Sequence, residues 1–330
     1  MLEMIKKLPV AMPMFTAYHY AGSAGIIAAN NPTSKSWYYS NTINWRCIQP
    51  TLEYYNLDLS ICNCSIWDMP FIEKSNTSFR FIRKYVIEII EEMLIQDCYV
   101  IFSGVDDYYI QGKHGYMQRH YNHDGLIVGF DSERKKLSMV AYDERGLYRE
   151  FETPYDGFIR GIEYECEHGK YGVLTSAQVD CNYICELDPQ KIKSLLKEYI
   201  SEHTEQGYFP GISITVVYGM LVYNAIVEYI KMFVHKELPI EALDQRIFRY
   251  IYEHKRCMYQ RIVALEKHLN IDTLLKNEYN QIQKTAESIR FRTIKAELSK
   301  NPELLTNVIC NIQQMFEIEN KVLSQLISIL

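Results

Sequence analysis

The sequence predicts an α+β fold with an antiparallel sheet in its first half and helices in its second half. In the first half, short apolar runs alternate with polar residues and are separated by turn-forming residues, a pattern typical of strands. From residue 212 onward, apolar residues recur at helical spacing, and Pro239 and Pro302 interrupt the pattern. We therefore divide the chain into an α+β region at 1–200 and an all-helical region at 201–330.

The elements of the first half follow from local patterns. Small residues and then apolar residues predict a short helix at 22–29, which the Asn-Asn-Pro sequence at 30–32 ends. A second short helix is predicted near 47–56, and apolar residues at helical spacing predict an amphipathic helix at 79–95. Strands are predicted at 98–102, 122–131, 137–143, 147–153 and 173–183.

The second half begins with a clear helix start. Asp188 suits an N-cap and Pro189 suits the first turn, and the helix is expected to run to about residue 202. Further helices are predicted at 212–235, 240–269, 272–299 and 302–329.

The composition excludes several classes of protein. The chain has 330 residues, a net charge of −6 and no long basic run, so we expect no nucleic-acid partner. Its nine cysteines form no small-domain disulfide framework, and its start lacks the apolar core of a signal peptide. The longest apolar stretch, 212–234, contains several polar residues and is not expected to span a membrane. We therefore expect a reduced, cytoplasmic protein with no membrane partner.

The most informative motif places a histidine at the start of one predicted strand and an aspartate at the end of the next. If the turn centres near Glu133, residues whose numbers sum to about 266 face each other, so His123 lies opposite Asp143. A carboxylate in that position holds an imidazole in the tautomer that a general base needs. The register therefore predicts the His–Asp half of a nucleophilic triad.

The nucleophile is expected at the start of the first helix. Papain-like enzymes place a thiol at the N-terminus of a buried helix, whose free N–H groups lower the pKa of the thiol and stabilise an oxyanion. A cysteine followed by glycine and small residues commonly opens such helices, but the residue here is Ala21. We interpret Ala21 as the nucleophile position, where the cysteine is absent either by substitution or naturally.

Two other nucleophiles remain open. Ser23 lies on the same first turn, although a hydroxyl needs stronger activation than a thiol. Cys47 lies next to Arg46 at a plausible helix start, with Pro50 suited to the first turn. A cysteine on an apolar face is, however, usually a small hydrophobic residue.

Other polar residues are candidates for a substrate cleft. His120 is a second candidate base, and it is equally interpreted as a loop histidine that lines the cleft. Asp106, Asp107 and Tyr108 follow a predicted strand, and adjacent carboxylates suit a cationic amine, although charged loop residues are usually solvated. The cysteine spacings match no zinc site, so no metal is expected.

Two regions of the chain resemble a known family. The first contains VDDYY at 105–109, Tyr116, His120 and HDGLIVGFD at 123–131. The second is IFRYIYEHKR at 247–256. In these motifs the chain resembles the butirosin biosynthesis protein H N-terminal-domain family. This family is papain-like and occurs in natural-product gene clusters. Its founding member resembles an acyltransferase that moves an aminoacyl group from a carrier-protein thioester to an amine.

The resemblance implies a papain-like cysteine-protease fold over 1–200, followed by the helical region. It also implies an amide-forming acyltransferase of a thiotemplated pathway, similar to the enzyme that builds closthioamide, in nonribosomal peptide or antibiotic biosynthesis. The acyl donor would be carried on the phosphopantetheine of an acyl or peptidyl carrier protein, so no other cofactor is implied. The acceptor would be a small amine or diamine.

The implied mechanism has two steps. A thiolate at position 21 would attack the thioester, and the amine would then take the acyl group from the enzyme. His123 would move protons, Asp143 would orient it, and N–H groups at and near Gly22 would hold the oxyanion. Basic residues could dock an acidic carrier protein or form a solvated helix face, and these are Lys255, Arg256 and Arg261.

Two competing functions use the same residues. A cysteine peptidase would have the same triad with water as the acceptor. A non-catalytic binding protein would keep a degenerate papain-like cleft, in which alanine is the native residue at position 21.

Overall fold

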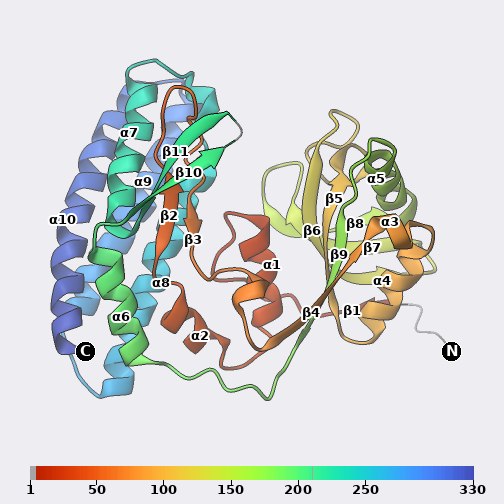
Figure 1. The fold of residues 1–330 in the computed structure, drawn as a ribbon, viewed down its shortest axis with the longest axis horizontal. Helices are drawn as coiled ribbons and strands as arrows, with labels where there is room; N and C mark the ends of the chain where they lie inside the picture. Colours follow the sequence, from red (N-terminus) through yellow and green to blue (C-terminus); the bar gives the residue numbers. More distant parts are fainter. Residues whose placement is uncertain (1–4, 210) are drawn as a thin grey trace. The chain divides into compact units, whose positions relative to one another are not determined.

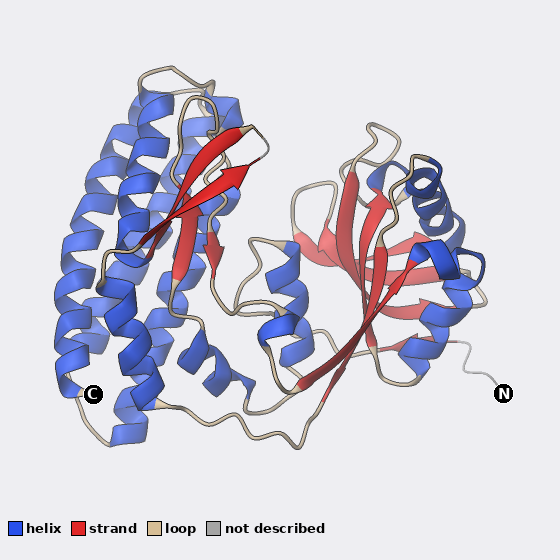
Figure 2. Cartoon of the chain, viewed as in Figure 1, coloured by secondary structure: helices blue, strands red, loops and turns tan. Residues whose placement is uncertain are grey.

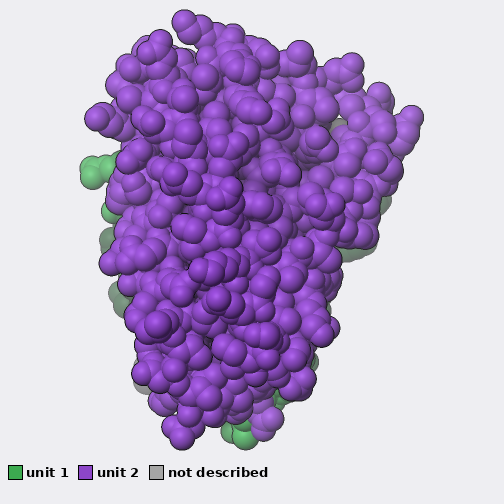
Figure 3. All heavy atoms as spheres, turned by 90° about the vertical axis from the view of Figure 1, so that its left-hand side faces the viewer, with its two compact units in different colours: residues 1–34, 65–184 green, residues 35–64, 185–330 purple. Residues whose placement is uncertain are grey.

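The computed structural model describes residues 5–209 and 211–330, and the chain forms two compact units. Unit 1 comprises Met1–Ser34 and Ser65–Ile184, and unit 2 comprises Lys35–Cys64 and Cys185–Leu330 (Figure 3). The fold is α+β with antiparallel sheets, as the sequence predicts (Figure 1, Figure 2). The units are interleaved along the chain, which replaces the single boundary expected at residue 200.

Unit 1 is built on a seven-stranded antiparallel sheet. Its strand order is β4-β9-β5-β6-β7-β8, and β1 pairs with β6. The strands are β1 (Ile5–Lys7), β4 (Ile72–Ser78), β5 (Tyr99–Asp106), β6 (Asn122–Asp131), β7 (Lys136–Tyr142), β8 (Tyr148–Pro154) and β9 (Val173–Val179). All the strands predicted from residue 98 onward are confirmed, whereas β1 and β4 are strands that the local pattern does not reveal.

Helices cover both faces of this sheet. Helix α1 (His19–Ala28) lies on one face, and α4 (Val86–Ile95) and α5 (Tyr155–Glu167) lie on the other (Figure 1). The short elements are α3 (Phe79–Ile82), η1 (Ile66–Asp68), η2 (Arg83–Tyr85) and η3 (Asp107–Tyr109). The single helix predicted at 79–95 is divided into α3, η2 and α4. The amphipathic pattern is confirmed in α4, which buries one apolar stripe. The helix predicted at 22–29 is also confirmed, with a start a few residues earlier.

Unit 2 contains a four-stranded sheet, part of which lies where the sequence predicts helices. Its strand order is β10-β11-β2-β3, and its strands are β2 (Trp45–Ile48), β3 (Ser60–Ile61), β10 (Thr204–Phe209) and β11 (Ile212–Tyr218). The helix predicted near 47–56 is wrong, and so is the helical start at 212. Residues 212–218 are rich in β-branched side chains, which favour a strand. Strand β11 pairs with β2 across a long sequence separation, so the second half is not all helical.

The helices of unit 2 form the rest of its core. They are α2 (Ser34–Asn41), α6 (Pro189–Ile200), α7 (Val222–Val234), α8 (Gln245–Leu269), α9 (Leu275–Leu298), α10 (Leu305–Ile329), η4 (Gly219–Leu221), η5 (Ile240–Ala242) and η6 (Pro302–Leu304). The N-cap prediction for α6 is confirmed, because Asp188 accepts the N–H of Lys191 at 2.9 Å. The part of the chain that the structure describes contains no helix both long and apolar enough to cross a membrane.

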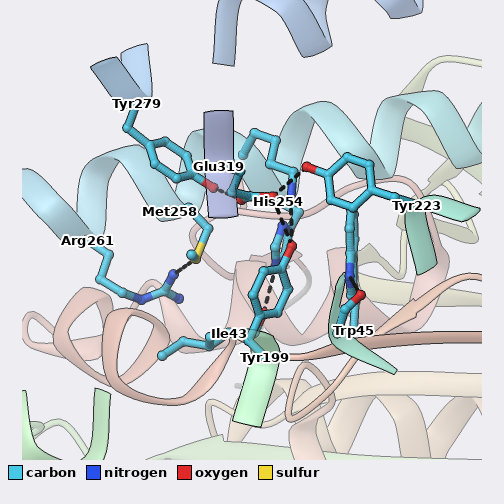
Figure 4. Close-up of polar contacts among 11 residues, drawn as sticks. Ile43, Trp45, Tyr199, Tyr223, His254, Met258, Arg261, Tyr279 and Glu319 are labelled. Atoms are coloured by element: carbon cyan, nitrogen blue, oxygen red, sulfur yellow. Dashed lines mark hydrogen bonds and ion pairs between the residues drawn. The ribbon is translucent and has the colours of Figure 1, made fainter. Parts of the chain in front are cut away.

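A buried ion pair joins the helices of unit 2 (Figure 4). Nζ of Lys255 donates to both carboxylate oxygens of Glu319, at 2.9 and 2.8 Å. Three tyrosine hydroxyls also donate to this carboxylate, and they belong to Tyr199, Tyr223 and Tyr279. The five side chains come from α8, α10, α6, α7 and α9, so one carboxylate connects all these helices. Lys255 and Arg261 are fully buried and therefore belong to neither a docking patch nor a solvated face.

Candidate functional site

The structure pairs His123 with Asp107. His123 lies at the start of β6, and Asp107 directly follows the neighbouring strand β5. Nδ1 of His123 lies 2.7 Å from Oδ2 of Asp107, which assigns the proton of the neutral ring to Nδ1. The side chain of Asp107 is 6% exposed and that of His123 is 27% exposed. Among the residues described, none occupies Nε2 of His123 with a hydrogen bond, so this nitrogen can accept a proton.

A buried lysine balances the charge of Asp107. Nζ of Lys113 lies 3.3 Å from Oδ1 of Asp107, as an ion pair whose geometry is too poor for a hydrogen bond. The same Nζ lies 3.3 Å from Nδ1 of His123 and donates to the carbonyl of Asp124 at 3.1 Å. Burial lowers the pKa of Lys113, and Asp107 opposes that effect. Because Asp107 is the closer partner of the ring, Lys113 acts on the carboxylate and leaves the tautomer of His123 unchanged.

Asp143 does not orient His123, which corrects the predicted triad. Its carboxylate accepts the N–H of Arg145 at 2.8 Å and of Leu147 at 2.9 Å, and it pairs with the guanidinium of Arg149. Burial acts to raise the pKa of Asp143, but these hydrogen bonds hold it below its ordinary value. The predicted register holds at Leu126, which faces Val140, but the pairing of β6 with β7 ends at these residues and does not include His123 and Asp143. Asp143 lies one residue beyond β7 and closes the turn that leads to β8.

His19, the first residue of helix α1, contacts His123. The ring of His19 lies edge-on to that of His123, with 4.5 Å between ring centroids. Ala21 is 0% exposed, so its side chain lies in the core. The N–H of Gly22 donates to the carbonyl of Tyr18 at 3.0 Å, which occupies the donor expected in the oxyanion hole. The helix is therefore placed as expected, but positions 21 and 22 do not present a nucleophile and a free N–H to His123.

A cavity of about 450 Å³ opens beside His123. Asp107, Tyr121 and Tyr142 contribute to its wall together with His123. Two arginines also line it, and they are Arg119 and Arg145. The guanidinium of Arg119 lies 5.2 Å from the ring centroid of Tyr121. The acidic residues Asp143 and Glu144 line it as well, so the wall carries charges of both signs. Guanidinium groups bind phosphate and carboxylate in fixed geometry, so the part of the wall formed by the arginines suits an anionic group.

A second cavity of about 190 Å³ lies between α1 and the sheet. Its polar lining includes Ser23 from α1 and Asp124 from β6, with Trp67 and Tyr20 contributing aromatic rings. Burial raises the pKa of Asp124 above its ordinary value. His19 lines this second cavity and its ring contacts that of His123, which lines the first, so this pair of histidine rings borders both cavities. The described residues that line the two cavities include no cysteine.

A second histidine–aspartate pair lies next to the first. Nδ1 of His120 lies 2.5 Å from Oδ2 of Asp106, whose side chain is 0% exposed. The ring of His120 stacks between those of Tyr108 and Tyr164. The expected substrate-binding residues Asp106, Asp107 and Tyr108 are therefore occupied by internal contacts, and the two carboxylates each hold a histidine.

The fallback nucleophile is poorly placed for catalysis. Cys47 lies within strand β2 of unit 2 and is 1% exposed. Burial and the nearby Asp58 raise the pKa of its thiol, which opposes formation of a thiolate. This residue is therefore a small core residue. The described part of the chain places no three histidine, cysteine or acidic side chains together as metal ligands.

Comparison with known proteins gives no family for this chain, so its function is argued from the geometry of the site. No family model matches this sequence, and no curated protein matches it. Of the residues above, the sequence points to His123 and His120 as bases and to Asp107 as a ligand for substrate. It gives no signal for His19, Lys113 or Arg119, because their contacts depend on how the loops before β6 and α1 fold back onto the sheet.

Proposed function

We propose that unit 1 is an acyltransferase that moves an acyl group from a thioester to an amine, with His123 as the general base. The observation that carries this proposal is the hydrogen bond of 2.7 Å between His123 and Asp107 at the edge of a cavity. An imidazole held in this tautomer, with Nε2 open, is what proton transfer from a nucleophile requires. The choice of thioester and amine rests on the family resemblance, and the same resemblance favours a papain-like fold and a natural-product pathway. The cytoplasmic location stays a prediction from the cysteine content.

The proposed reaction proceeds directly between the two substrates. The amine nitrogen attacks the thioester carbonyl carbon while Nε2 of His123 takes the proton of the amine. The tetrahedral intermediate then expels the thiolate, the C–S bond breaks, and the imidazolium returns the proton to sulfur. This route forms no acyl-enzyme, in agreement with the buried alanine at position 21, which offers no nucleophile.

Each cavity fits one substrate. The cavity with Arg119 and Arg145 suits the phosphate of a phosphopantetheine arm, and its arginines also suit the surface of an acidic carrier protein. The cavity with Asp124 suits a small amine, because a carboxylate and aromatic rings attract an ammonium group. The contact between His19 and His123, which line one cavity each, supports a base that acts between donor and acceptor.

The test uses a short thioester and a simple amine. The full chain is incubated with the butyryl thioester of N-acetylcysteamine and 1,3-diaminopropane, and products are followed by mass spectrometry. We expect N-(3-aminopropyl)butyramide and free N-acetylcysteamine, with the intact protein mass unchanged. His123→Gln should lower the rate by about 10²-fold or more, whereas the exposed histidine variant His168→Gln should leave it unchanged.

Other products identify other functions. Butyrate without amide identifies a hydrolase, and an adduct on the wild-type protein restores the covalent mechanism. An adduct on Ala21→Cys alone, released as amide, would show that position 21 becomes accessible. No product with any of these proteins overturns the acyl-transfer proposal for this donor.

A non-catalytic binding protein is the second candidate function, and the buried alanine at position 21 favours it. It predicts that the thioester shifts the NMR signals of residues such as Arg119 and Tyr121, while no amide or butyrate forms.

A further inference from the structure

Asp106 and His120 are held together by a short hydrogen bond and by aromatic rings that stack on the imidazole. Oδ2 of Asp106 accepts from Nδ1 of His120 at 2.5 Å. The imidazole lies between two phenol rings, with centroids 4.4 Å from Tyr108 and 4.1 Å from Tyr164. The ring of His168 contacts that of Tyr164 at a tilt of 38°, with 4.2 Å between the ring centroids. The carboxylate is completely buried, while the imidazole is 44% exposed.

This pair fixes the backbone around the catalytic pair. Oδ1 of Asp106 accepts the N–H of Tyr108 at 3.0 Å and of Tyr121 at 2.9 Å. The N–H of Asp107 donates to the carbonyl of Tyr121 at 2.9 Å. Asp107 is therefore held on both sides, and the chain is fixed two residues before His123.

We propose that Asp106 and His120 are positioning residues that hold Asp107 in register with His123. This inference rests on the proposed role of His123 as a base. The carboxylate of Asp107 must stay within a few tenths of an ångström to keep the proton on Nδ1 of His123, because a displacement of about 1 Å breaks such a hydrogen bond. Losing the His120 contact frees the turn that carries Asp107, and Nε2 of His123 is then protonated in part of the molecules.

The direct readout is the tautomer of His123, which nitrogen-15 NMR reports without any substrate. In the wild type we expect the neutral ring to carry its proton on Nδ1. His120→Phe keeps a ring in the stack and removes the donor to Asp106, so we expect a mixture of the two tautomers at His123. Asp106→Asn should have the same effect. The matched control is His168→Gln, because the ring of His168 also contacts Tyr164, while its Nδ1 lies 2.7 Å from the carbonyl oxygen of Tyr164 and not from Asp106.

Kinetics give a second readout. We expect His120→Phe to lower kcat by about tenfold and to change KM little, because misplacement of a catalytic group affects the chemical step. His120→Asn retains a side-chain N–H that can reach Asp106, so it should recover part of the lost rate and serves as the variant to study if His120→Phe does not fold.

The outcomes separate this inference from the proposed function. If wild-type His123 carries its proton on Nε2, the general-base proposal fails. If the wild type shows Nδ1 protonation and folded His120→Phe and Asp106→Asn keep it, the positioning role is overturned while the base remains. If His168→Gln shifts the tautomer as much as His120→Phe, the stack rather than the Asp106 hydrogen bond determines the geometry, and the inference is again overturned.

Discussion

Two pairs in this protein each join a carboxylate to a nitrogen base, Asp107 to His123 and Glu319 to Lys255, but they differ in exposure to a cavity. In unit 1, Asp107 holds His123, whose side chain is 27% exposed at the edge of a cavity. In unit 2, Glu319 holds Lys255, and both side chains are 0% exposed (Figure 4). The unit 2 carboxylate also accepts three tyrosine hydroxyls, so it has no capacity left for a ligand.

The comparison shows that a charged pair is not by itself a site. A buried pair whose donors and acceptors are all satisfied stabilises one packing arrangement of the helices, and removing one partner is costly. A pair with an open ring nitrogen next to a cavity can exchange a proton with a ligand.

The largest effect is expected at the unit 2 pair. Glu319→Gln leaves the ammonium of Lys255 buried without its counter-charge, and we expect a loss of about 3–5 kcal/mol in the free energy of unfolding. Urea denaturation followed by circular dichroism measures this change. The control is Glu228→Gln, because the Glu228–Lys231 pair is largely exposed and should contribute less than about 1 kcal/mol. Equal losses in the two variants would contradict the structural role of the buried pair.

The second effect falls on activity. Asp107→Asn removes the charge that orients His123 and stabilises its imidazolium, and we expect the rate of amide formation to fall by about 10²-fold. The thioester assay with 1,3-diaminopropane measures it. Because Lys113 also loses its ion pair, the folded fraction is checked by urea denaturation. Full activity in a folded Asp107→Asn protein would remove His123 and Asp107 from the mechanism.

A third effect is the pH dependence of unfolding. Burial lowers the pKa of Lys255 from 10.5 to about 8, so between these values the unfolded chain binds the proton that the folded chain has released. The free energy of unfolding of the wild type, relative to Lys255→Met, should therefore rise from pH 8 toward pH 10.5. Denaturation at pH 7, about 9 and about 10 tests the sign. A difference that falls across this range would show that burial does not dominate the titration of Lys255.

The tyrosines around Glu319 change stability in the opposite direction. Burial raises the pKa of Tyr199, Tyr223 and Tyr279 well above their ordinary value of 10. Above that pH the unfolded chain releases phenol protons that the folded chain retains, so the free energy of unfolding falls as pH rises. Replacing Tyr279 by Phe should reduce this fall, as alkaline urea denaturation can measure.

Local patterns predicted the elements of unit 1 better than those of unit 2. Alternation and turn residues are properties of nearby residues, which is why the register of Leu126 with Val140 is correct. Strand β11 has a β-branched run that favours a strand, but its partner β2 is far away in the sequence. Without that partner in view, the helical spacing of the apolar residues predicts a helix at 212–235. The interleaving of the units follows from this distant pairing and is not visible locally.

The candidate site shows the same division. His123 was identified because it opens a strand, but its acidic partner was not. The sequence Asp143-Glu-Arg-Gly146 is a turn signal, and an aspartate at the start of a turn commonly accepts backbone N–H groups, so this residue could have been excluded as a partner. Asp107 becomes the partner because the consecutive strands β5 and β6 pair antiparallel, but residues 107–121 join them, and a connection of this length does not fix the register as a tight turn does.

The smallest effect separates the two aspartates that the sequence and the structure offer to His123. Asp143→Asn keeps one side-chain oxygen for the N–H groups of Arg145 and Leu147, and it loses only the charge that faces Arg149. Because Asp143 makes no hydrogen bond to His123 among the residues described, we expect amide formation to change little while Asp107→Asn is strongly impaired. The pKa of Asp143 is held low in the folded protein, so its substitution should reduce stability modestly above the ordinary carboxyl range and not below it. If Asp143→Asn instead abolished activity and Asp107→Asn did not, the triad predicted from strand register would replace the pair seen in the structure.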